Sequence, residues 1–229
     1  MGAGIWSLTL SGVGEQLLKS LEGMLCATEQ SRLIKITHPQ RRRAFICGHA
    51  LSYLAYRYCY PNEHQSVYIV DDKQGRPQMV GGRPFDFSLT HSGDFCLCAF
   101  SICGRVGVDL ERLRIGRDIR GIAEHYFHPE ELQLLAASQD YSRTFYTLWV
   151  LREALLKMQG IGLQVPLRKL RFFEQQGEWY YGGELKMGTP EFLVSELSGY
   201  LLGLAVEGVS PLLFTLKRIE PANLIADKV

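Results

Sequence analysis

Two carboxylates stand two residues apart in the stretch GVDLER. A strand predicted over residues 104–111 places Asp109 and Glu111 on the same face, because successive side chains of a strand alternate. At ~6.5 Å the two charges repel each other by roughly 2–3 kcal/mol at an effective dielectric near 20. A magnesium ion would offset this repulsion, since Mg²⁺ binds one or two carboxylates together with phosphate oxygens and water. The alternative is that both side chains face solvent and pair with Arg112 or Arg114, and the strand pattern alone favours that arrangement.

A third carboxylate lies in the stretch WVLREALLK, within a helix predicted over residues 141–158. Trp149, Glu153 and Lys157 recur every four residues and therefore share one helix face. A buried Trp149 would carry Glu153 toward the interior. The alternative is an ordinary surface pair of Glu153 with Lys157, which stabilises a helix by ~0.3–0.5 kcal/mol.

Cations gather at Arg41, Arg42 and Arg43, just inside a helix that Thr37 is predicted to cap. Positive charges in the first turn of a helix oppose its dipole. They become favourable where an anion binds, because helix N-termini and arginine side chains both bind phosphate. The alternative is a solvated basic face.

A histidine, His91, lies in the polar segment 90–94 between two predicted strands. A serine beside a histidine is not a hydrolase signature without an acidic partner and a nucleophile elbow. On this basis alone His91 is equally an ordinary turn residue.

The elements that would position these residues alternate irregularly between strands and helices. A helix starting at Thr37 should end near Pro61, and Asp140 and Gly160 are predicted to cap and end the second long helix. Further predicted helices cover 14–25 and start at Pro129, and strands are predicted at 5–10, 67–70, 84–89, 95–102 and 104–111 and in several runs after 169. The order predicts an α+β fold, sandwich-like, with two similar subdomains over 1–103 and 104–229.

The composition excludes several classes of protein. The 229 residues carry 25 Lys+Arg and 24 Asp+Glu, and the 46% hydrophobic and 21% charged fractions are those of a folded globular protein. A net charge of +1 argues against a nucleic-acid binder held mainly by phosphate contacts. The absence of a long apolar run or a signal-like start predicts a cytoplasmic protein. Its six cysteines have no metal or C-x-x-C spacing and are expected to be reduced thiols.

The order of the motifs resembles that of the Sfp-type 4'-phosphopantetheinyl transferases. The matching stretches are Gly75-Arg76-Pro77, FSLTHS at 87–92, VGVDLE at 106–111 and WVLREALLK at 149–157. The segments 43–48 and 126–131 are also similar to family segments, so the resemblance covers most of the chain. The spacing of G-x-D-x-E and W-x-x-[basic]-E-A-x-x-K makes it specific.

The resemblance implies an activity and a fold. Members of this family transfer the 4'-phosphopantetheine arm of coenzyme A (CoA) to a serine of an acyl, peptidyl or aryl carrier protein, and release adenosine 3',5'-bisphosphate. The implied fold has two α/β subdomains related by a pseudo-twofold axis, with CoA and Mg²⁺ in the cleft between them. A monomer that binds CoA and an apo-carrier protein is expected, without nucleic-acid or membrane partners.

The resemblance also implies roles for individual residues. Asp109, Glu111 and Glu153 would hold the magnesium ion, and Glu153 or a water molecule would take the proton of the serine. The expected CoA contacts are Lys157, His91, Asp109 and Arg43 near the phosphates, with Arg41 or Arg42 as substitutes for Arg43, then Gly75, Arg76 and Pro77 beside the adenine, and Thr90 next to His91.

The chain departs from the family pattern at four positions. Ser88 stands where Asn is usual, Thr90 where Ser is usual, and Arg76 and Arg152 where Lys is usual. Because arginine does not lose its proton, Arg152 is a poor proton carrier, although a phosphate contact remains expected.

Two other functions stay open at this stage. A magnesium-dependent pyrophosphate hydrolase would use similar residues, but the chain has no Walker loop and no G-x-G-x-x-G. An inactive CoA-binding or carrier-binding module of the same fold is the non-enzymatic alternative, and the intact set Asp109, Glu111 and Glu153 argues against it.

Overall fold

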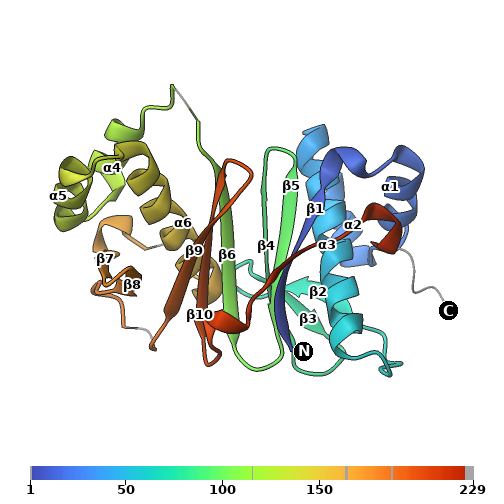
Figure 1. The fold of residues 1–229 in the computed structure, drawn as a ribbon. Coiled ribbons are helices and arrows are strands. Elements are labelled where there is room, and N and C mark those ends of the chain that lie inside the picture. The colour runs from blue at the N-terminus through green and yellow to red at the C-terminus, as the bar shows by residue number, and fades with distance from the viewer. Residues whose placement is uncertain (1, 115, 163–164, 187, 225–229) are drawn as a thin grey trace.

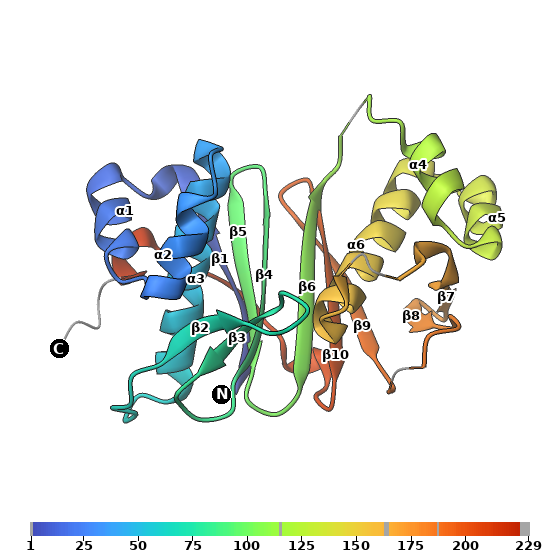
Figure 2. The same ribbon diagram turned by 180° about the vertical axis from the view of Figure 1, so that it is seen from behind.

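The computed structural model describes residues 2–114, 116–162, 165–186 and 188–224. Two antiparallel-rich sheets stand side by side in the middle of the molecule, and helices cover the outer side of each (Figure 1; Figure 2). The predicted α+β class is confirmed. No helix in the described ranges is long and apolar enough to cross a membrane.

In the described residues, the half of the molecule built around the N-terminal strand β1 contains a four-stranded sheet and three α-helices. One strand of this sheet, β11, comes from the C-terminal end of the chain. The sheet order is β11 (Leu216–Arg218), β1 (Ala3–Thr9), β5 (Phe95–Ser101) and β4 (Asp86–Ser92). The helices are α1 (Glu15–Glu22), α2 (Ala27–Ile34) and α3 (Pro39–Cys59), and a separate hairpin is formed by β2 (Tyr68–Asp71) and β3 (Pro77–Val80). The single helix predicted at 14–25 is thus α1, which ends before Gly23, and α2 was not predicted.

The second half contains a three-stranded sheet and three helices. The sheet order is β6 (Arg105–Arg112), β10 (Tyr200–Glu207) and β9 (Glu191–Leu197). The helices are α4 (Ile119–Tyr126), α5 (Pro129–Ala137) and α6 (Tyr141–Gln159), and β7 (Phe172–Gln175) pairs with β8 (Glu178–Tyr181).

Three apolar clusters hold these layers together. One lies between α1–α3 and the first sheet, another between α4–α6 and the second sheet, and the third joins inner-face residues of both sheets, such as Leu97 and Val108. The chain passes from the first sheet to the second between β5 and β6, close to residue 103. It returns when β11 pairs in parallel with β1. The division into subdomains 1–103 and 104–229 stays a prediction.

The facing edge strands β4 and β6 are joined by side chains instead of backbone pairs. Every second residue of β4 accepts a hydrogen bond from a backbone N–H of β6, at 2.8–3.3 Å. The pairs are Asp86 with Val106, Ser88 with Val108, Thr90 with Leu110 and Ser92 with Arg112. We call this row of bonds the polar seam; it holds the two halves in a fixed register along their common border (Figure 2).

Helix ends and turns differ from the sequence prediction in two places. The α3 helix starts at Pro39 and is capped by His38, whose ring accepts from the N–H of Arg41 at 3.5 Å, so the predicted cap at Thr37 was wrong by one residue. The predicted polar corner at 90–94 is shorter, since β4 continues through Ser92 and only Gly93 and Asp94 turn. The predicted cap of α6 at Asp140 and its end at Gly160, with φ +73°, are confirmed.

Candidate active site

The two carboxylate motifs come together because α6 packs directly on β6. Gly107 permits this close approach, since a Cβ there would overlap the carbonyl oxygen of Ala154 in α6. The helix therefore presents Glu153 and Lys157 next to the end of β6 that carries Asp109. Asp109 is more than forty residues from Glu153 and Lys157 in the sequence, and the packing of α6 on β6 brings them together.

Asp109 forms the centre of the site. Its Oδ1 accepts from the Lys157 ammonium at 2.7 Å and from the Thr90 hydroxyl at 3.1 Å. Lys157 also donates to the carbonyl oxygen of Val108 at 3.1 Å. The Asp109 side chain is only 10% exposed, so these contacts are largely shielded from water. Among the described residues the ion-pair partner of Lys157 is Asp109, so the simple surface pair with Glu153 is wrong.

The two neighbouring glutamates, Glu153 and Glu111, are partly buried close to the charge of Asp109. Burial and the charge of Asp109 raise the pKa of Glu153, against the opposing effect of Lys157 and Arg152. Burial and Asp109 likewise raise the pKa of Glu111, although Arg117 and Arg114 oppose the shift. A raised pKa means that the charged form of the carboxylate is disfavoured, so a nearby cation would stabilise that form.

These carboxylates have the donor chemistry that magnesium prefers, but they do not form a closed shell. Within the described ranges no group of three Asp, Glu, His or Cys residues is arranged to hold a metal ion. Because Mg²⁺ takes only one or two carboxylates and completes its shell with phosphate and water oxygens, Asp109 with Glu111 or Glu153 still fits such an ion. The metal assignment therefore stays a prediction.

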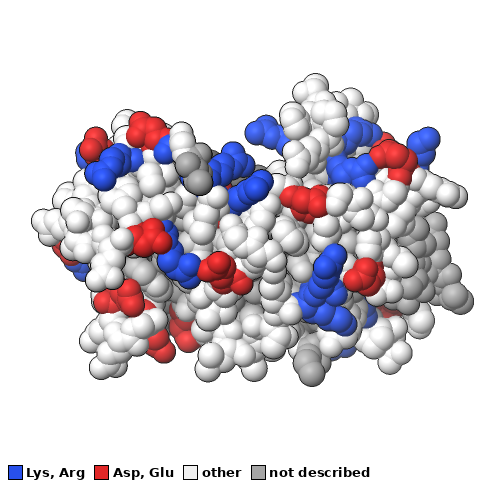
Figure 3. Space-filling model, turned by 45° about the horizontal axis from the view of Figure 1, so that its top comes forward, with Lys and Arg blue, Asp and Glu red and all other residues white. Residues whose placement is uncertain are grey.

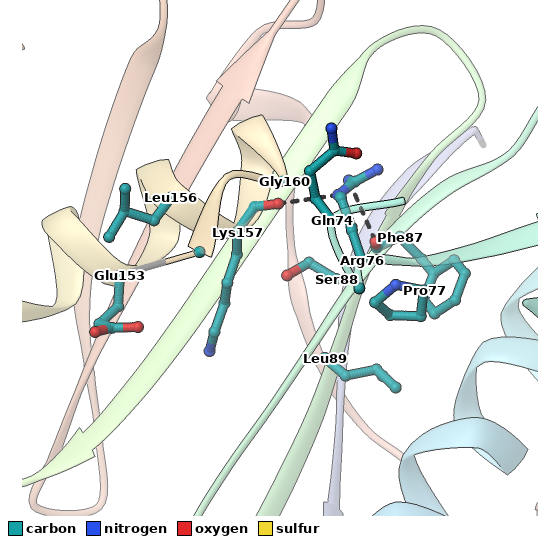
Figure 4. A pocket seen from close by; sticks show the side chains of 12 residues that line it. Gln74, Arg76, Pro77, Phe87, Ser88, Leu89, Glu153, Leu156, Lys157 and Gly160 are labelled. Carbon is teal, nitrogen blue, oxygen red and sulfur yellow. Dashed lines mark hydrogen bonds between the residues drawn. The ribbon is translucent and has the colours of Figure 1, made fainter. Parts of the chain in front are cut away.

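Three cavities lie around this site; Lys157 lines two of them and Asp109 lines one. The hairpin cavity, about 240 Å³, lies between the β2–β3 turn and the end of α6, and is lined by Gly75, Arg76, Pro77, Glu153 and Lys157 (Figure 4). The carboxylate cavity, about 490 Å³, is lined by Thr90, His91, Asp109, Glu111 and Lys157. The cationic cavity, about 510 Å³, is lined by Arg32, Lys35, His38, Arg41 and His91. Leu89 lines all three, so they are adjacent, and we refer to them together as the cleft.

The surface is notched between the two halves of the molecule, and both basic and acidic side chains lie on either side of the notch (Figure 3). A carboxylate centre surrounded by cations suits a ligand that brings several negative charges and a metal ion.

Comparisons with known proteins show the family of this chain. Residues 105–205 match the family model described as the 4'-phosphopantetheinyl transferase superfamily. The 4'-phosphopantetheinyl transferase HetI of a Nostoc species is 30% identical over 165 residues, which cover 69% of each chain. This chain belongs to the 4'-phosphopantetheinyl transferase family. The predicted family and enzyme class are confirmed.

Other members of the 4'-phosphopantetheinyl transferase family are similar over shorter stretches. A putative member from Haemophilus influenzae is 37% identical over 45% of each chain. The transferase Sfp of Bacillus subtilis is 29% identical over 47% of this chain and 48% of its own. Among solved structures, the holo-[acyl-carrier-protein] synthase of Helicobacter pylori in complex with coenzyme A is 15% identical, with a TM-score of 0.39, over 44% of this chain and 99% of its own.

Within the transferase, Arg43 does not face the cleft. Its guanidinium donates to the carbonyl oxygens of Leu10 and Val13 and pairs with Glu15. Arg41 instead lines both the cationic and the carboxylate cavity. Residues two positions apart in a helix point ~200° away from each other, so only one of Arg41 and Arg43 can face the cleft. A helical-wheel comparison with the apolar face of α3 is the sequence signal that distinguishes them.

His91 borders two of the cavities and is surrounded by positive charge. Desolvation and the charges of Lys157 and Arg41 lower its pKa, while Asp109 opposes the shift. The imidazole therefore takes up a proton less readily than that of an ordinary histidine.

Arg152 was expected to contact phosphate, and this expectation was wrong. Its side chain is 1% exposed and forms an ion pair with Glu131, which is 0% exposed. The guanidinium also donates to the carbonyl oxygen of Leu148 at 3.1 Å and lies 4.1 Å from the centre of the Phe127 ring. One residue along a helix turns the side chain by ~100°, so Arg152 faces the core while Glu153 faces the cleft.

Breaking this buried pair should cost far more stability than breaking its exposed neighbour. Glu131→Gln is expected to lower the free energy of unfolding by about 3–5 kcal/mol, because it leaves Arg152 as an unpaired buried charge. The matched control is Glu130→Gln, which breaks a half-exposed pair with Arg171 and should cost no more than ~1 kcal/mol. Urea unfolding of the two variants measures both values. Equal losses would contradict the buried role of Arg152.

Proposed function

We propose that this transferase moves the 4'-phosphopantetheine arm of CoA to a serine of an acyl, peptidyl or aryl carrier protein, with Mg²⁺, and releases adenosine 3',5'-bisphosphate. The observation that carries the proposal is the contact of Lys157 with Asp109, at the point where the hairpin and carboxylate cavities meet. One cation and one carboxylate held together at the centre of a cleft suit the transfer of a charged phosphoryl group.

The charge distribution supports the binding of CoA along the cleft. The residues that line the cationic cavity include Arg32, Lys35 and Arg41, and no carboxylate belongs to its described lining. Such a cavity suits the phosphate groups of CoA. The hairpin cavity has apolar walls, including Pro77 and Leu156, and suits a flat base or an uncharged chain. Both halves of one chain line the cleft, which supports a monomer as the working form.

The proposed reaction is a displacement at the β-phosphorus of CoA. The serine oxygen of the carrier forms a bond to this phosphorus, and the bond from the phosphorus to the bridging pyrophosphate oxygen breaks. The leaving group is adenosine 3',5'-bisphosphate, and the serine proton goes to Glu153 or to a water molecule that Glu153 orients. Without a metal ion, burial and the charge of Asp109 raise the pKa of Glu153, which favours proton uptake by its carboxylate. Lys157 stabilises charge that develops on the phosphate oxygens.

A magnesium ion, when bound, would offset the charge of the pyrophosphate and align it for displacement. Asp109 together with Glu111 or Glu153 would hold it, and phosphate and water oxygens would complete its shell. Lys157 would then exchange part of its contact with Asp109 for a phosphate oxygen. Its side chain is 31% exposed, which leaves it room to turn toward a ligand.

A panel of apo-carrier proteins incubated with CoA tests the proposal. One carrier should gain the mass of a phosphopantetheinyl group, as measured on the intact protein. EDTA should abolish the gain and Mg²⁺ should restore it. Free phosphopantetheine without a gain in carrier mass would indicate a hydrolase. CoA binding without either product would indicate an inactive module.

The placement of Arg41 and Arg43 gives opposite expectations for their variants. Arg41→Ala should raise the KM for CoA about tenfold or more, because a charge-assisted hydrogen bond to phosphate contributes ~1.5–3 kcal/mol. Arg43→Ala should leave this KM within about twofold, since Arg43 is already paired with Glu15. Steady-state kinetics with a responsive carrier measures both. A larger effect at Arg43 would restore it as the phosphate ligand.

A further inference from the structure

Arg76 lines the hairpin cavity, yet its guanidinium is turned into the protein. The side chain is 7% exposed, and both of its terminal nitrogens donate to the carboxylate of Asp86, at 2.8 and 2.7 Å. The guanidinium also donates to the carbonyl oxygens of Lys157 at 2.9 Å and Val106 at 3.1 Å. Four of its five N–H groups therefore have partners inside the chain.

These bonds join four separate elements at one point. Arg76 stands at the β2–β3 turn, Asp86 starts β4, Val106 belongs to β6, and Lys157 belongs to the last turns of α6. Asp86 also accepts the N–H of Val106 at 2.8 Å, as the first bond of the polar seam. Figure 4 shows the guanidinium between the end of α6 and the strand that carries Phe87.

The end of α6 is fitted closely around the Arg76 side chain. Gly160 ends the helix with φ +73°, and a Cβ at this position would lie only 2.9 Å from Cδ of Arg76. A side chain at 160 would thus move Arg76 as well as strain the backbone. The end of α6 and the Arg76 side chain are therefore packed against each other.

Lys157 has a hydrogen-bond partner within the chain at each of its ends. Its backbone carbonyl is held by Arg76, and its ammonium is held by Asp109. A bidentate pair of arginine and carboxylate is rigid, because two parallel hydrogen bonds define the plane of the guanidinium. The position of the Lys157 ammonium relative to Asp109 therefore depends on the pair of Arg76 with Asp86.

We propose that Arg76, held by Asp86, is a positioning residue that sets the place of Lys157 for phosphoryl transfer. The proposal rests on the proposed function and goes beyond it, because it gives Arg76 a role through Lys157. Arg76 lines the hairpin cavity, so its expected place beside the adenine stays a prediction.

Arg76→Lys distinguishes this role from a direct phosphate contact. Lysine keeps the positive charge and is itself a good phosphate ligand, so a simple ligand role would largely survive. Lysine cannot reproduce the planar fork that reaches a carboxylate and two carbonyl oxygens together. The substitution therefore removes the positioning and retains the charge.

The experiment measures transfer kinetics and CoA binding by calorimetry for Arg76→Lys and Asp86→Asn. The control is Arg83→Lys, an exposed arginine of the same region whose guanidinium lies 4.8 Å from the centre of the Tyr60 ring. Both test variants should lower kcat about tenfold or more, with the Kd for CoA changed less than about threefold, which is the pattern of a lost transition-state contact. The control should match the wild type.

A double-mutant cycle with Lys157→Ala separates positioning from general stability. In the Lys157→Ala background, adding Arg76→Lys should lower kcat by no more than about twofold, because the ammonium that Arg76 positions is already gone. The backbone carbonyl remains in that background, so a merely structural role would cost as much as in the wild type. An equal loss in both backgrounds, or a rise in Kd with an unchanged kcat, would overturn the proposal.

A measurement that does not need turnover completes the test. The acetylation rate of Lys157, followed by mass spectrometry, should rise several-fold in Arg76→Lys and stay unchanged in Arg83→Lys, because only the first releases the ammonium from Asp109. An unchanged rate in Arg76→Lys would overturn the proposal, even if the wild type transfers nothing and the proposed function fails. If Arg76→Lys does not fold, Asp86→Asn gives the same readout.

Discussion

Asp109→Asn should lower kcat/KM for transfer about 100-fold or more, a loss of roughly 3 kcal/mol of transition-state stabilisation. The substitution keeps the shape of the side chain and removes the charge that holds Lys157 and that a magnesium ion would bind. Its effect on stability should be small, because Lys157 is 31% exposed and water can solvate it after the pair is lost. Initial rates and thermal midpoints of the same preparation measure the two effects.

The matched control for Asp109→Asn is Glu196→Gln. Glu196 pairs with Arg143 at 2.7 Å on the surface of the second half, away from the three cavities. Its loss should leave the rate unchanged. Full activity of a folded Asp109→Asn variant would return Asp109 to a structural role.

Glu153→Gln should slow transfer about 100-fold, because it removes a proposed metal ligand and a candidate base while preserving the shape of the side chain. The same substitution should raise the stability of the folded protein. Burial and the charge of Asp109 raise the pKa of Glu153, so its carboxylate form destabilises the folded state once the pH rises above that pKa. The variant should therefore melt higher than the wild type at pH 8.

The pH dependence checks this sign. At pH 4 the wild-type Glu153 takes up a proton, and the two proteins should melt alike. Melting curves of the two proteins at the two pH values, recorded without Mg²⁺, provide the measurements. A variant that melts lower at pH 8 and turns over normally would show that Glu153 is structural.

The elements that carry the site were predictable from local signals. Asp140 and Gly160 mark the ends of α6, and the apolar alternation around Asp109 marks β6. The resemblance to the transferase family then joined the two motifs, and the structure gives the physical reason, because α6 can approach β6 only over the side-chain-free surface of Gly107.

The partners of the charged side chains were not predictable in the same way. Helical spacing pairs Lys157 with Glu153, but the tertiary fold offers it Asp109 instead. Arg152 was expected to contact phosphate, but its partner is Glu131, which lies 21 positions away in the sequence and beside it in the core. Arg41 and Arg43 have the same chemistry, and only the packing of α3 decides which of them faces the cleft.

The most direct test of the central claim is to measure both products in one reaction mixture. Wild-type protein, CoA, Mg²⁺ and a responsive apo-carrier should yield modified carrier and adenosine 3',5'-bisphosphate in equal amounts, followed by intact mass and by chromatography. Asp109→Asn should yield neither at a comparable rate. Release of the nucleotide without modification of the carrier, or equal yields from the Asp109→Asn variant, would contradict the account.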